Sequence, residues 1–311
     1  MTRALVFAGS SFVGKHLCRL LREKNVEVIS TARRPTDETT LACDLTCRED
    51  VSAAIAQTRP DWIIQCGAAT ASSSPRDHYA VHVTGALNVL EAAHEFVPDA
   101  SILLFGSAAE YGPVPPEDLP VAESYPCRPT SFFGASKLAQ THLAQAAAIA
   151  NGQRITIVRP FNIIGPGLPD HYFAAALAKR LIAQKSALEA GLTIDRTFEV
   201  HNPHATRDFI DVRDVASAVY FLLDQHSPDP GQAALFNIAT GQETSILEVA
   251  SHLGTLAGNL TPTSASETTS RAGITRSCGN IQARINSGWQ PLISWRASID
   301  DLCHENADVI T

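Results

Sequence analysis

The sequence predicts an α/β fold whose strands form a parallel sheet. Short apolar runs alternate with longer amphipathic stretches through the first half of the chain, a pattern typical of βαβ units with right-handed connections. The chain has 311 residues, of which 45% are hydrophobic and 18% are charged. This length and composition suffice for one large domain or two modest ones, and they exclude a disordered chain and a coiled coil.

The expected elements follow from hydrophobic periodicity and from the turn residues between the apolar runs. Runs rich in Val, Ile, Leu and Phe are typical of strands, and apolar residues at helical spacing are typical of amphipathic helices. The expected strands span Ala4–Ala8, Val26–Thr31, Trp62–Cys66, Ser101–Phe105 and Ile155–Arg159, and the helices between them span Val13–Lys24, Val51–Thr58, His78–Phe96 and Ser131–Ala150.

The pattern loosens after Arg159, and we expect a smaller, irregular module there that packs on the sheet. Residues 201–214 mix polar and apolar side chains without a helical period. Gly and Pro residues predict a loop at 165–169, and Ser and Thr residues predict another at 261–270. Further helices are expected over Tyr172–Ala190, Val215–Leu223 and Ile246–Leu253.

Charge and cysteine usage argue against several classes of protein. The chain has 24 Lys and Arg residues against 32 Asp and Glu residues, whereas sequence-independent nucleic-acid binding needs a basic surface. No apolar run approaches the roughly 20 residues of a membrane span, and the first strand is too short for a signal peptide. The seven cysteines include no CxxC pair and no zinc-site spacing. We expect a cytoplasmic protein with reduced thiols, no metal, and no membrane or nucleic-acid partner.

A turn of small residues follows the first strand and favours a dinucleotide site. Small side chains let the backbone approach a pyrophosphate, and the helix N-terminus offers N–H donors and a positive dipole. Any tight turn between a strand and a helix also favours Gly and Ser, so this segment alone is a weak signal. The residues that lead into the helix are Gly9, Ser10, Ser11, Phe12, Val13 and Gly14.

The end of the second strand bears on the choice between NAD and NADP. No acidic residue stands at its tip to accept hydrogen bonds from a ribose 2′-hydroxyl. Arg33 and Arg34 follow instead and suit a 2′-phosphate, so the sequence favours NADP and leaves NAD open. Two solvated arginines on a loop are an equally good interpretation. Asp44 would either bind the adenine edge or cap the next helix.

An ordered series of motifs runs through nearly the whole chain. The motifs are Gly9–Gly14, Asp44-Leu45, Gly67-Ala68-Ala69, Ser107-Ala108-Ala109-Glu110-Tyr111-Gly112, Gly134-Ala135-Ser136-Lys137, Arg159-Pro160-Phe161-Asn162, Gly165-Pro166-Gly167 and Arg207–Asp214. On these motifs the chain resembles the extended short-chain dehydrogenases/reductases of the nucleotide-sugar epimerase/dehydratase group. It looks most similar to the GDP-4-keto-6-deoxy-mannose reductases and their dehydratase relatives. Each motif alone is modest, whereas the ordered set is highly specific.

The resemblance implies a Rossmann fold, a doubly wound parallel sheet, with a smaller C-terminal α/β substrate-binding domain. Residues 1–160 would form the NAD(P)-binding domain, with parts of 205–245 returning to it, and residues 161–311 would form the substrate-binding domain. A nucleotide-diphosphate sugar would lie across the cleft between them. Many relatives form homodimers through two long helices, which correspond here to His78–Phe96 and Ser131–Ala150.

In this family a Ser or Thr hydroxyl, a Tyr and a Lys carry the chemistry. Ser107 and Lys137 match the hydroxyl and the lysine, but Phe133 stands in place of the tyrosine, four residues before the lysine on one helical face. The family lysine lowers the pKa of the tyrosine and binds the nicotinamide ribose. The tyrosine exchanges a proton with the sugar, and the hydroxyl polarises the same oxygen. A phenylalanine ring fits that position but has no proton to give.

Three interpretations of Phe133 remain open from the sequence. The protein is a relative that binds cofactor or sugar with little turnover, or another group supplies the acid, or Phe133 is an introduced substitution for tyrosine. The loss of one general acid costs roughly 10²–10⁴-fold in rate, so residual activity is compatible with each interpretation. The candidate acids are Tyr111, His171, Tyr172 and a water held by Ser107.

Other positions also depart from the family pattern. Ala8 and Ser11 occupy the places of the first and middle glycines, which predicts weakened or rearranged cofactor binding. His82 replaces a common asparagine, and a packed helix histidine is the favoured interpretation. Ala109 stands where the dehydratases have the carboxylate that removes the C5 proton, and the adjacent Glu110 would point elsewhere on a strand. Dehydration is therefore disfavoured.

The resemblance implies the remaining site residues. Asn162 matches an asparagine of the cofactor and sugar site, and Arg207 and Arg271 are placed for the diphosphate and ribose. A surface position explains Arg271 equally well, and Arg180 is a weaker candidate. The sequence thus predicts an NAD(P)-dependent reductase of a 4-keto-6-deoxyhexose, with a 4-epimerase or an impaired relative as alternatives. The site is completed by Leu45, Gly67, Ala68 and Pro160 for the cofactor, and by Thr70 and Ala108 for the sugar.

Overall fold

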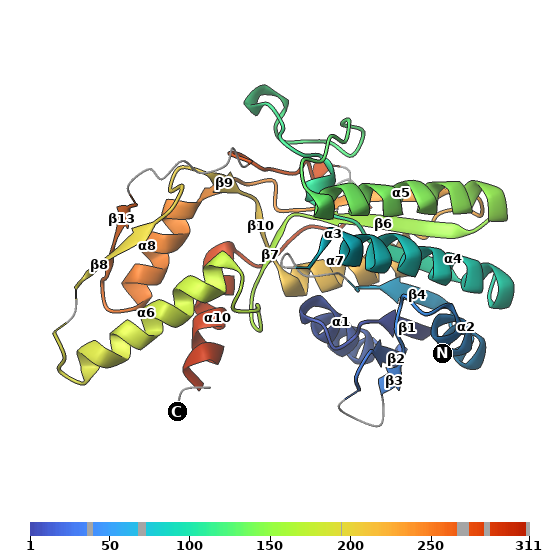
Figure 1. Cartoon of the computed structure of the whole chain (residues 1–311), viewed down its shortest axis with the longest axis horizontal. Helices are drawn as coiled ribbons and strands as arrows, with labels where there is room; N and C mark the ends of the chain where they lie inside the picture. The colour runs from blue at the N-terminus through green and yellow to red at the C-terminus, as the bar shows by residue number, and fades with distance from the viewer. Residues whose placement is uncertain (36–39, 68–72, 194, 266–273, 283–286, 309–311) are drawn as a thin grey trace.

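The computed structural model describes the chain except for residues 36–39, 68–72, 194, 266–273, 283–286 and 309–311. Figure 1 shows two lobes, one built on a sheet with helices on both faces and a smaller one of helices and short strands. No helix in the described part of the chain combines the length and the apolar character that a membrane span needs.

The larger lobe is built on a seven-stranded sheet in which all neighbouring strands are parallel. The order β11-β6-β5-β4-β1-β2-β3 reverses its direction of growth between β1 and β4, which confirms the expected doubly wound α/β fold. The strands span Arg3–Phe7 (β1), Glu27–Ala32 (β2), Thr40–Ala42 (β3), Trp62–Gln65 (β4), Ser101–Phe105 (β5), Arg154–Pro160 (β6) and Ala233–Ile238 (β11).

Helices cover both faces of this sheet because its strands bury both faces. Successive residues of β1 belong to two separate hydrophobic clusters, as a strand's alternation requires. Ala4 packs in the cluster of α1 and α7, and Leu5 packs in the cluster of α2, α4 and α5. The helices of this lobe are α1 (Phe12–Glu23), α2 (Arg48–Thr58), α3 (Pro75–Tyr79), α4 (Gly85–Phe96), α5 (Phe132–Asn151) and α7 (Val212–Gln225).

The helix expected at 78–96 begins earlier and is not a uniform α-helix. Its first turns form α3, which begins after Ser74, whose hydroxyl accepts the N–H of Asp77 in a capping box. A π-helical turn (Ala80–Thr84) then joins α3 to α4. This turn carries His82, which is fully buried, as expected of a packed helix histidine. Such π-helical turns are rare and are frequently found at functional sites.

The smaller lobe has its own hydrophobic core, to which α6, α8 and α10 all contribute. Three pairs of short strands accompany these helices. The elements are α6 (Phe173–Glu189), α8 (Ile246–Leu256) and α10 (Trp295–Asp308), with β7 (Asn162–Ile164) beside β10 (Phe209–Asp211), β9 (Thr206–Arg207) beside β12 (Thr244–Ser245), and β8 (Thr197–Val200) beside β13 (Thr261–Ser264).

Four elements correct the sequence analysis. The loop expected at 261–270 begins with β13, a largely polar segment that is a strand because it pairs in parallel with β8. The edge strand β11 and the last helix α10 were not predicted at all. The helix expected from Val215 begins at Val212 instead, because Asp211 caps it by accepting the N–H of Arg213.

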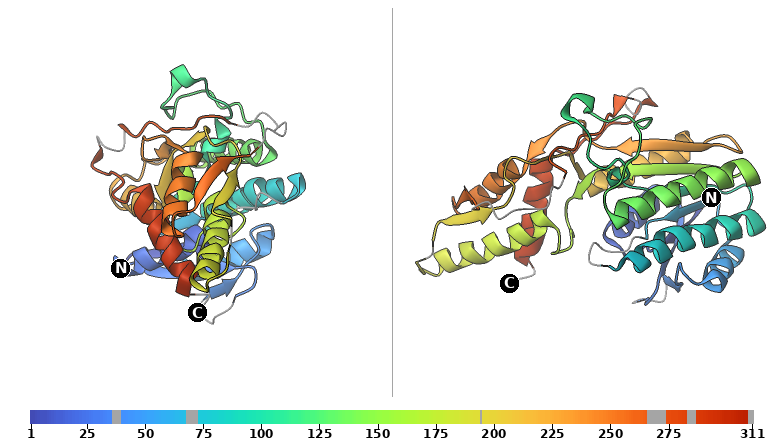
Figure 2. Two further views of the ribbon diagram at one scale, coloured as in Figure 1. Left: turned by 90° about the vertical axis from the view of Figure 1, so that its left-hand side faces the viewer. Right: turned by 45° about the horizontal axis from the view of Figure 1, so that its top comes forward.

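Between β5 and α5 the chain makes a long excursion over residues 112–130. Figures 1 and 2 show this excursion projecting from the top of the sheet lobe. It is held at Val121, which donates its N–H to the oxygen of Cys278 and accepts the N–H of Asn280, both at 2.9 Å. The excursion therefore contacts the C-terminal part of the chain beside the junction of the two lobes.

Candidate active site

A cavity of about 590 Å³ lies at the carboxyl ends of the parallel strands. Its walls come from the segments that follow β1, β4, β5 and β6 and from the loop that leads into α6. Doubly wound sheets bind their ligands at this place, where the strand order reverses. The sequence-predicted residues that the cavity brings together are Ser11, Phe12, Val13, Ser107, Phe133, Lys137, Pro160, Asn162 and Arg207.

The N-terminus of α1 forms a cradle of backbone N–H groups at this cavity. Ser11 caps the helix, and its hydroxyl accepts the N–H of Gly14 at 3.2 Å. Within the described residues, the N–H groups of Phe12 and Val13 donate to no acceptor, so they are free to bind phosphate oxygens. A Cβ at Gly14 would stand 2.5 Å from the oxygen of Ala8, so only glycine fits there. These features fit the pyrophosphate of a dinucleotide.

The turn before this helix keeps its path without the usual first glycine. Ala8 has a φ of 58°, in the left-handed region, which costs an alanine roughly 1–2 kcal/mol. A Cβ at Gly9 would lie 2.6 Å from the Cβ of Ser30, so a glycine is needed where the turn packs against β2. The turn therefore carries backbone strain at Ala8 and packs tightly at Gly9.

The end of β2 presents positive charge beside an ordered carboxylate. Arg33 and Arg34 are both exposed there. Asp44 accepts the N–H of Thr46 at 2.9 Å and its hydroxyl at 2.7 Å, and these bonds hold the pKa of Asp44 below its usual range, with a smaller contribution from Arg33. Helix α2 begins after Cys47, which occupies the capping position, so Asp44 does not cap this helix.

Ser107 and Lys137 both line the cavity near the end of β5. The Ser107 hydroxyl oxygen accepts the N–H of Ala109 at 3.1 Å, and its hydrogen has no acceptor in the described part of the chain. Lys137 is 2% exposed, and its Nζ donates to the oxygen of Phe105 at 2.6 Å and to Oε1 of Gln140 at 3.2 Å. Burial lowers the pKa of Lys137 to about 8.

Phe133 lines the same cavity, one turn before Lys137 on α5. Its ring packs edge to face on His82 and His78, with ring centroids 5.4 and 5.8 Å apart. His82 Nδ1 lies 2.8 Å from the hydroxyl of Ser136, and burial lowers the pKa of His82 to about 2. An apolar ring therefore fills the tyrosine position, and the buried His82 behind it is neutral at physiological pH.

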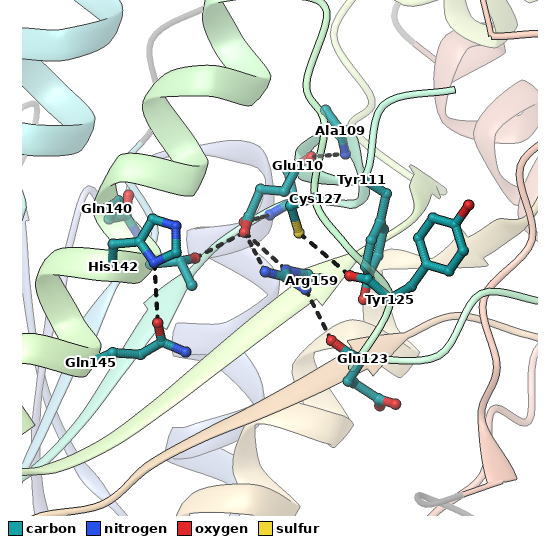
Figure 3. A network of polar contacts seen from close by, with 12 residues as sticks. Ala109, Glu110, Tyr111, Glu123, Tyr125, Cys127, Gln140, His142, Gln145 and Arg159 are labelled. Carbon is teal, nitrogen blue, oxygen red and sulfur yellow. Dashed lines mark hydrogen bonds and ion pairs between the residues drawn. The ribbon is translucent and has the colours of Figure 1, made fainter. Parts of the chain in front are cut away.

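Glu110 and Arg159 form a buried ion pair close to the end of β5 (Figure 3). Glu110 is fully buried, and its Oε2 lies 2.8 Å from Nη2 of Arg159. The same carboxylate accepts the hydroxyl of Thr141 and the backbone N–H of Ser107, each at 2.9 Å. Glu110 therefore points away from the cavity, as expected, although it stands on a 3₁₀ turn (Ala108–Glu110) and not on a strand.

The candidate acids differ in their access to the cavity. Tyr111 is 1% exposed, its hydroxyl donates to Oδ1 of Asn237 at 2.7 Å, and burial raises its pKa to about 12. Tyr111 is therefore a structural group. His171 and Tyr172 line the cavity on the loop before α6, with ring centroids 4.3 Å apart, and both are exposed.

A second cavity of about 180 Å³ continues the first toward the excursion. Its walls include Ala108, as the resemblance implies, and apolar side chains of the excursion such as Leu119 and Val121. The two cavities share the lining residues Ser107, Pro160, Phe161, Asn162 and Arg207.

Arg207 is the cationic group at the junction of the two cavities. Within the described residues it makes one hydrogen bond, from Nη1 to the oxygen of Thr206 at 2.7 Å, and it pairs with no carboxylate. Burial lowers its pKa, since a desolvated guanidinium without a counter-ion is disfavoured. Sequence reasoning missed Arg276, which lines the smaller cavity and pairs with Glu243 from a distant part of the chain.

The remaining predicted residues that the structure describes do not line either cavity in the same way. Arg180 lines neither cavity, and its guanidinium lies 5.6 Å from the ring centroid of Phe198. Leu45 and Gly67 lie against each other, since a Cβ at Gly67 would be 2.5 Å from Cδ1 of Leu45. The predictions for Ala68, Thr70 and Arg271 lie outside the described residues.

A doubly wound sheet with a helix N-terminus, Ser107 and Lys137 around a cavity at its carboxyl edge is typical of α/β proteins that bind nucleotides. Residues 4–239 match the model of the NAD dependent epimerase/dehydratase family, and the chain belongs to this family. GDP-6-deoxy-D-mannose reductase of Pseudomonas aeruginosa is 30% identical over 247 residues, which are 77% of this chain and 78% of that protein.

Two solved structures show the same architecture over nearly the whole chain. The structure of RMD from Pseudomonas aeruginosa complexed with NADPH has a TM-score of 0.85 at 28% identity and covers 99% of this chain and 100% of that chain. The UDP-glucose 4-epimerase of Thermus thermophilus in complex with NAD has a TM-score of 0.82 at 25% identity and covers 98% of this chain and 99% of that chain.

Proposed function

We propose that this protein is an NADP-dependent oxidoreductase that reduces a nucleotide-linked 4-keto-6-deoxyhexose. The observation that carries this proposal is a single cavity that brings together the α1 cradle, Ser107, Lys137 and the unpaired Arg207. The similarity to a protein named GDP-6-deoxy-D-mannose reductase supports a sugar of this class.

NADP is the proposed cofactor, and when bound it supplies the hydride. The N–H groups at the start of α1 would hold its pyrophosphate. Arg33 and Arg34 would receive the 2′-phosphate, since two exposed guanidinium groups at the tip of β2 suit a dianion better than a free hydroxyl. NAD is the second candidate, because one similar structure contains NADPH and another contains NAD.

The residues of this chain have separate tasks in the proposed reaction. Arg207 and Asn162 would bind the diphosphate and the sugar where the two cavities join. Ser107 would donate a hydrogen bond to the carbonyl oxygen, where negative charge develops. Glu110 is a positioning residue, because its carboxylate holds the backbone N–H of Ser107. Ala109 offers no base for the C5 proton, which disfavours dehydration.

A 4-epimerase is the alternative enzyme, favoured by the similarity to a UDP-glucose 4-epimerase. An epimerase retains its nicotinamide cofactor through both hydride transfers. Cofactor that copurifies with the protein, together with no net consumption of NADPH, would favour this alternative over the reductase.

We also propose a domain organisation, an oligomeric state and a cellular environment for this protein. We propose that residues 1–160, with α7 and β11 returning from 205–245, form the cofactor-binding domain, and that 161–311 form the substrate-binding domain. A homodimer through α4 and α5 is supported by two exposed apolar side chains on these helices, Leu87 and Ile149. The free state of all seven cysteines supports a reducing, cytoplasmic environment.

The proposed function is tested by restoring the missing hydroxyl. NADPH absorbance would be followed with GDP- and dTDP-4-keto-6-deoxyhexoses, for the protein and for its Phe133→Tyr variant. We expect the variant to be about 10²–10⁴-fold faster, the usual contribution of one general acid. Phe132→Tyr is the matched control, because it adds the same hydroxyl at an exposed neighbouring position. If neither the protein nor Phe133→Tyr consumes NADPH with these sugars, the reductase proposal is wrong.

A further inference from the structure

The reduction of a ketone needs a proton, and Phe133 cannot supply it. Lys137 is a buried ammonium that lines the same cavity and forms no ion pair with any carboxylate of the described residues. Two of its three N–H groups are directed to the oxygens of Phe105 and Gln140. The third N–H remains for a partner in the cavity.

Ser107 lines the same cavity, and since its hydroxyl and Nζ of Lys137 share no direct hydrogen bond among the described contacts, a water in the cavity would bridge the two groups. The oxygen that binds Nζ of Lys137 belongs to Phe105, two residues before Ser107, so the ammonium and the hydroxyl are held at the same strand end. The Ser107 hydroxyl uses one lone pair for the N–H of Ala109 and keeps a second lone pair. Its hydrogen has no acceptor in the described part of the chain, so the hydroxyl can take up one proton while it releases another.

We propose that Lys137 is the proton source of this chain, and that Ser107 relays the proton to the substrate oxygen. The proposal rests on the proposed function. The carbonyl carbon takes up the hydride that a bound dihydronicotinamide supplies, and the carbonyl oxygen takes the hydroxyl proton of Ser107. Ser107 regains a proton from the ammonium of Lys137 through one bridging water in the cavity, and the resulting neutral amine is reprotonated by solvent. The ketone is thereby reduced to an alcohol, and the dihydronicotinamide is oxidised.

The surroundings of Lys137 suit this task. Burial lowers the pKa of Lys137 to about 8, while Glu110 and Cys66 oppose the change. His82, the other titratable group that interacts with Lys137, is neutral and adds no charge. Near neutral pH the ammonium is therefore the main form, and it is a much stronger acid than an ordinary lysine.

The first test measures the pKa of Lys137 directly and needs no substrate. The chain has five lysines, so the ¹³Cε resonances of ¹³C-labelled lysine can be assigned with single Lys→Arg variants. We expect Lys137 to titrate near pH 8, well below the usual value for lysine. A Lys137 that titrates at the usual value for lysine overturns the proposal.

The second test separates proton donation from cofactor binding. Lys137→Arg keeps the charge, but a guanidinium does not release its proton in this pH range. We expect this variant to bind NADPH within a few-fold of the parent by fluorescence quenching, and to lose roughly 10²-fold or more in kcat. The parent kcat should fall as the pH rises through the value measured for Lys137, because the acid form is lost. Lys185→Arg is the matched control.

The remaining outcomes distinguish this proposal from the proposed function. If Phe133→Tyr reduces the sugar while the parent is inactive, the Lys137 relay is wrong and the reductase function stands. If the parent loses its turnover in Tyr172→Phe or His171→Phe but keeps it in Lys137→Arg, a group on the α6 loop is the acid and the relay is wrong. If both the parent and Phe133→Tyr are inactive, both proposals fail.

Discussion

The buried ion pair between Glu110 and Arg159 couples the stability of the fold to the placement of Ser107. Glu110→Gln removes the charge that pairs with Arg159, which is 3% exposed and has no other carboxylate partner among the described ion pairs. Removing one partner of a buried pair costs about 3–5 kcal/mol, because the other charge is left desolvated. At about 2–4 °C per kcal/mol for chains approaching this length, Tm should fall by roughly 10 °C.

Urea unfolding followed by circular dichroism would measure this loss. Glu117→Gln is the matched control, because Glu117 is exposed and should change the unfolding free energy by less than about 0.5 kcal/mol. Replacing both partners, as in Glu110→Gln with Arg159→Met, should restore part of the stability, since no buried charge is then unpaired. A loss below about 1 kcal/mol in Glu110→Gln, or a double variant that shows the sum of the two single losses, would refute the reasoning.

Three further predictions concern the cradle, the substrate and pH. Gly14→Ala should abolish NADPH binding in a fluorescence titration, because the new Cβ would clash with a backbone oxygen. Gly152→Ala is the control, since its Cβ would meet nothing within 4 Å. This control should lower stability through the positive φ of residue 152 and leave NADPH binding unchanged. Arg207→Met should raise the KM for the nucleotide sugar by roughly 10–100-fold, since a hydrogen bond to a charged group contributes about 1.5–3 kcal/mol. Because the pKa of His82 is lowered in the folded chain, the unfolded chain binds a proton that the folded chain excludes. The free energy of unfolding should therefore fall below about pH 6.5, by up to about 1.4 kcal/mol per pH unit. His82→Asn should remove this pH dependence in urea unfolding.

The sequence predicts those strands whose own residues show a strong apolar pattern. Strands β1, β4 and β5 are dominated by large apolar residues, because they are covered on both faces. The edge strand β11 has the weaker pattern Ala-Ala-Leu-Phe-Asn-Ile, with its first four residues only partly buried. The segment of β13 is polar and largely exposed, and only its pairing with β8 makes it a strand. Such pairing is a tertiary effect that local pattern does not contain.

The candidate site likewise has residues that the sequence could predict and features that only the folded chain shows. The family resemblance implied Ser107 and Lys137, and both line the cavity. The partner of Glu110 could not be found, because Arg159 lies 49 residues further along the chain. The environment of Arg207 was equally hidden, since its lack of a carboxylate partner is a property of the folded chain.

The structure also bears on the origin of Phe133. Its ring contacts His82, the residue that replaces the family's common asparagine, at a centroid distance of 5.4 Å. His82 lies on a π-helical turn, and its Nδ1 contacts Ser136, which immediately precedes Lys137. A single introduced Tyr→Phe change accounts for Phe133 but not for a second departure packed against it, nor for the strained Ala8 in the cradle. Because Phe133 lines the cavity and His82 packs against its ring, these departures are better explained by a site that has diverged as a unit, in which the proton comes from a group other than residue 133.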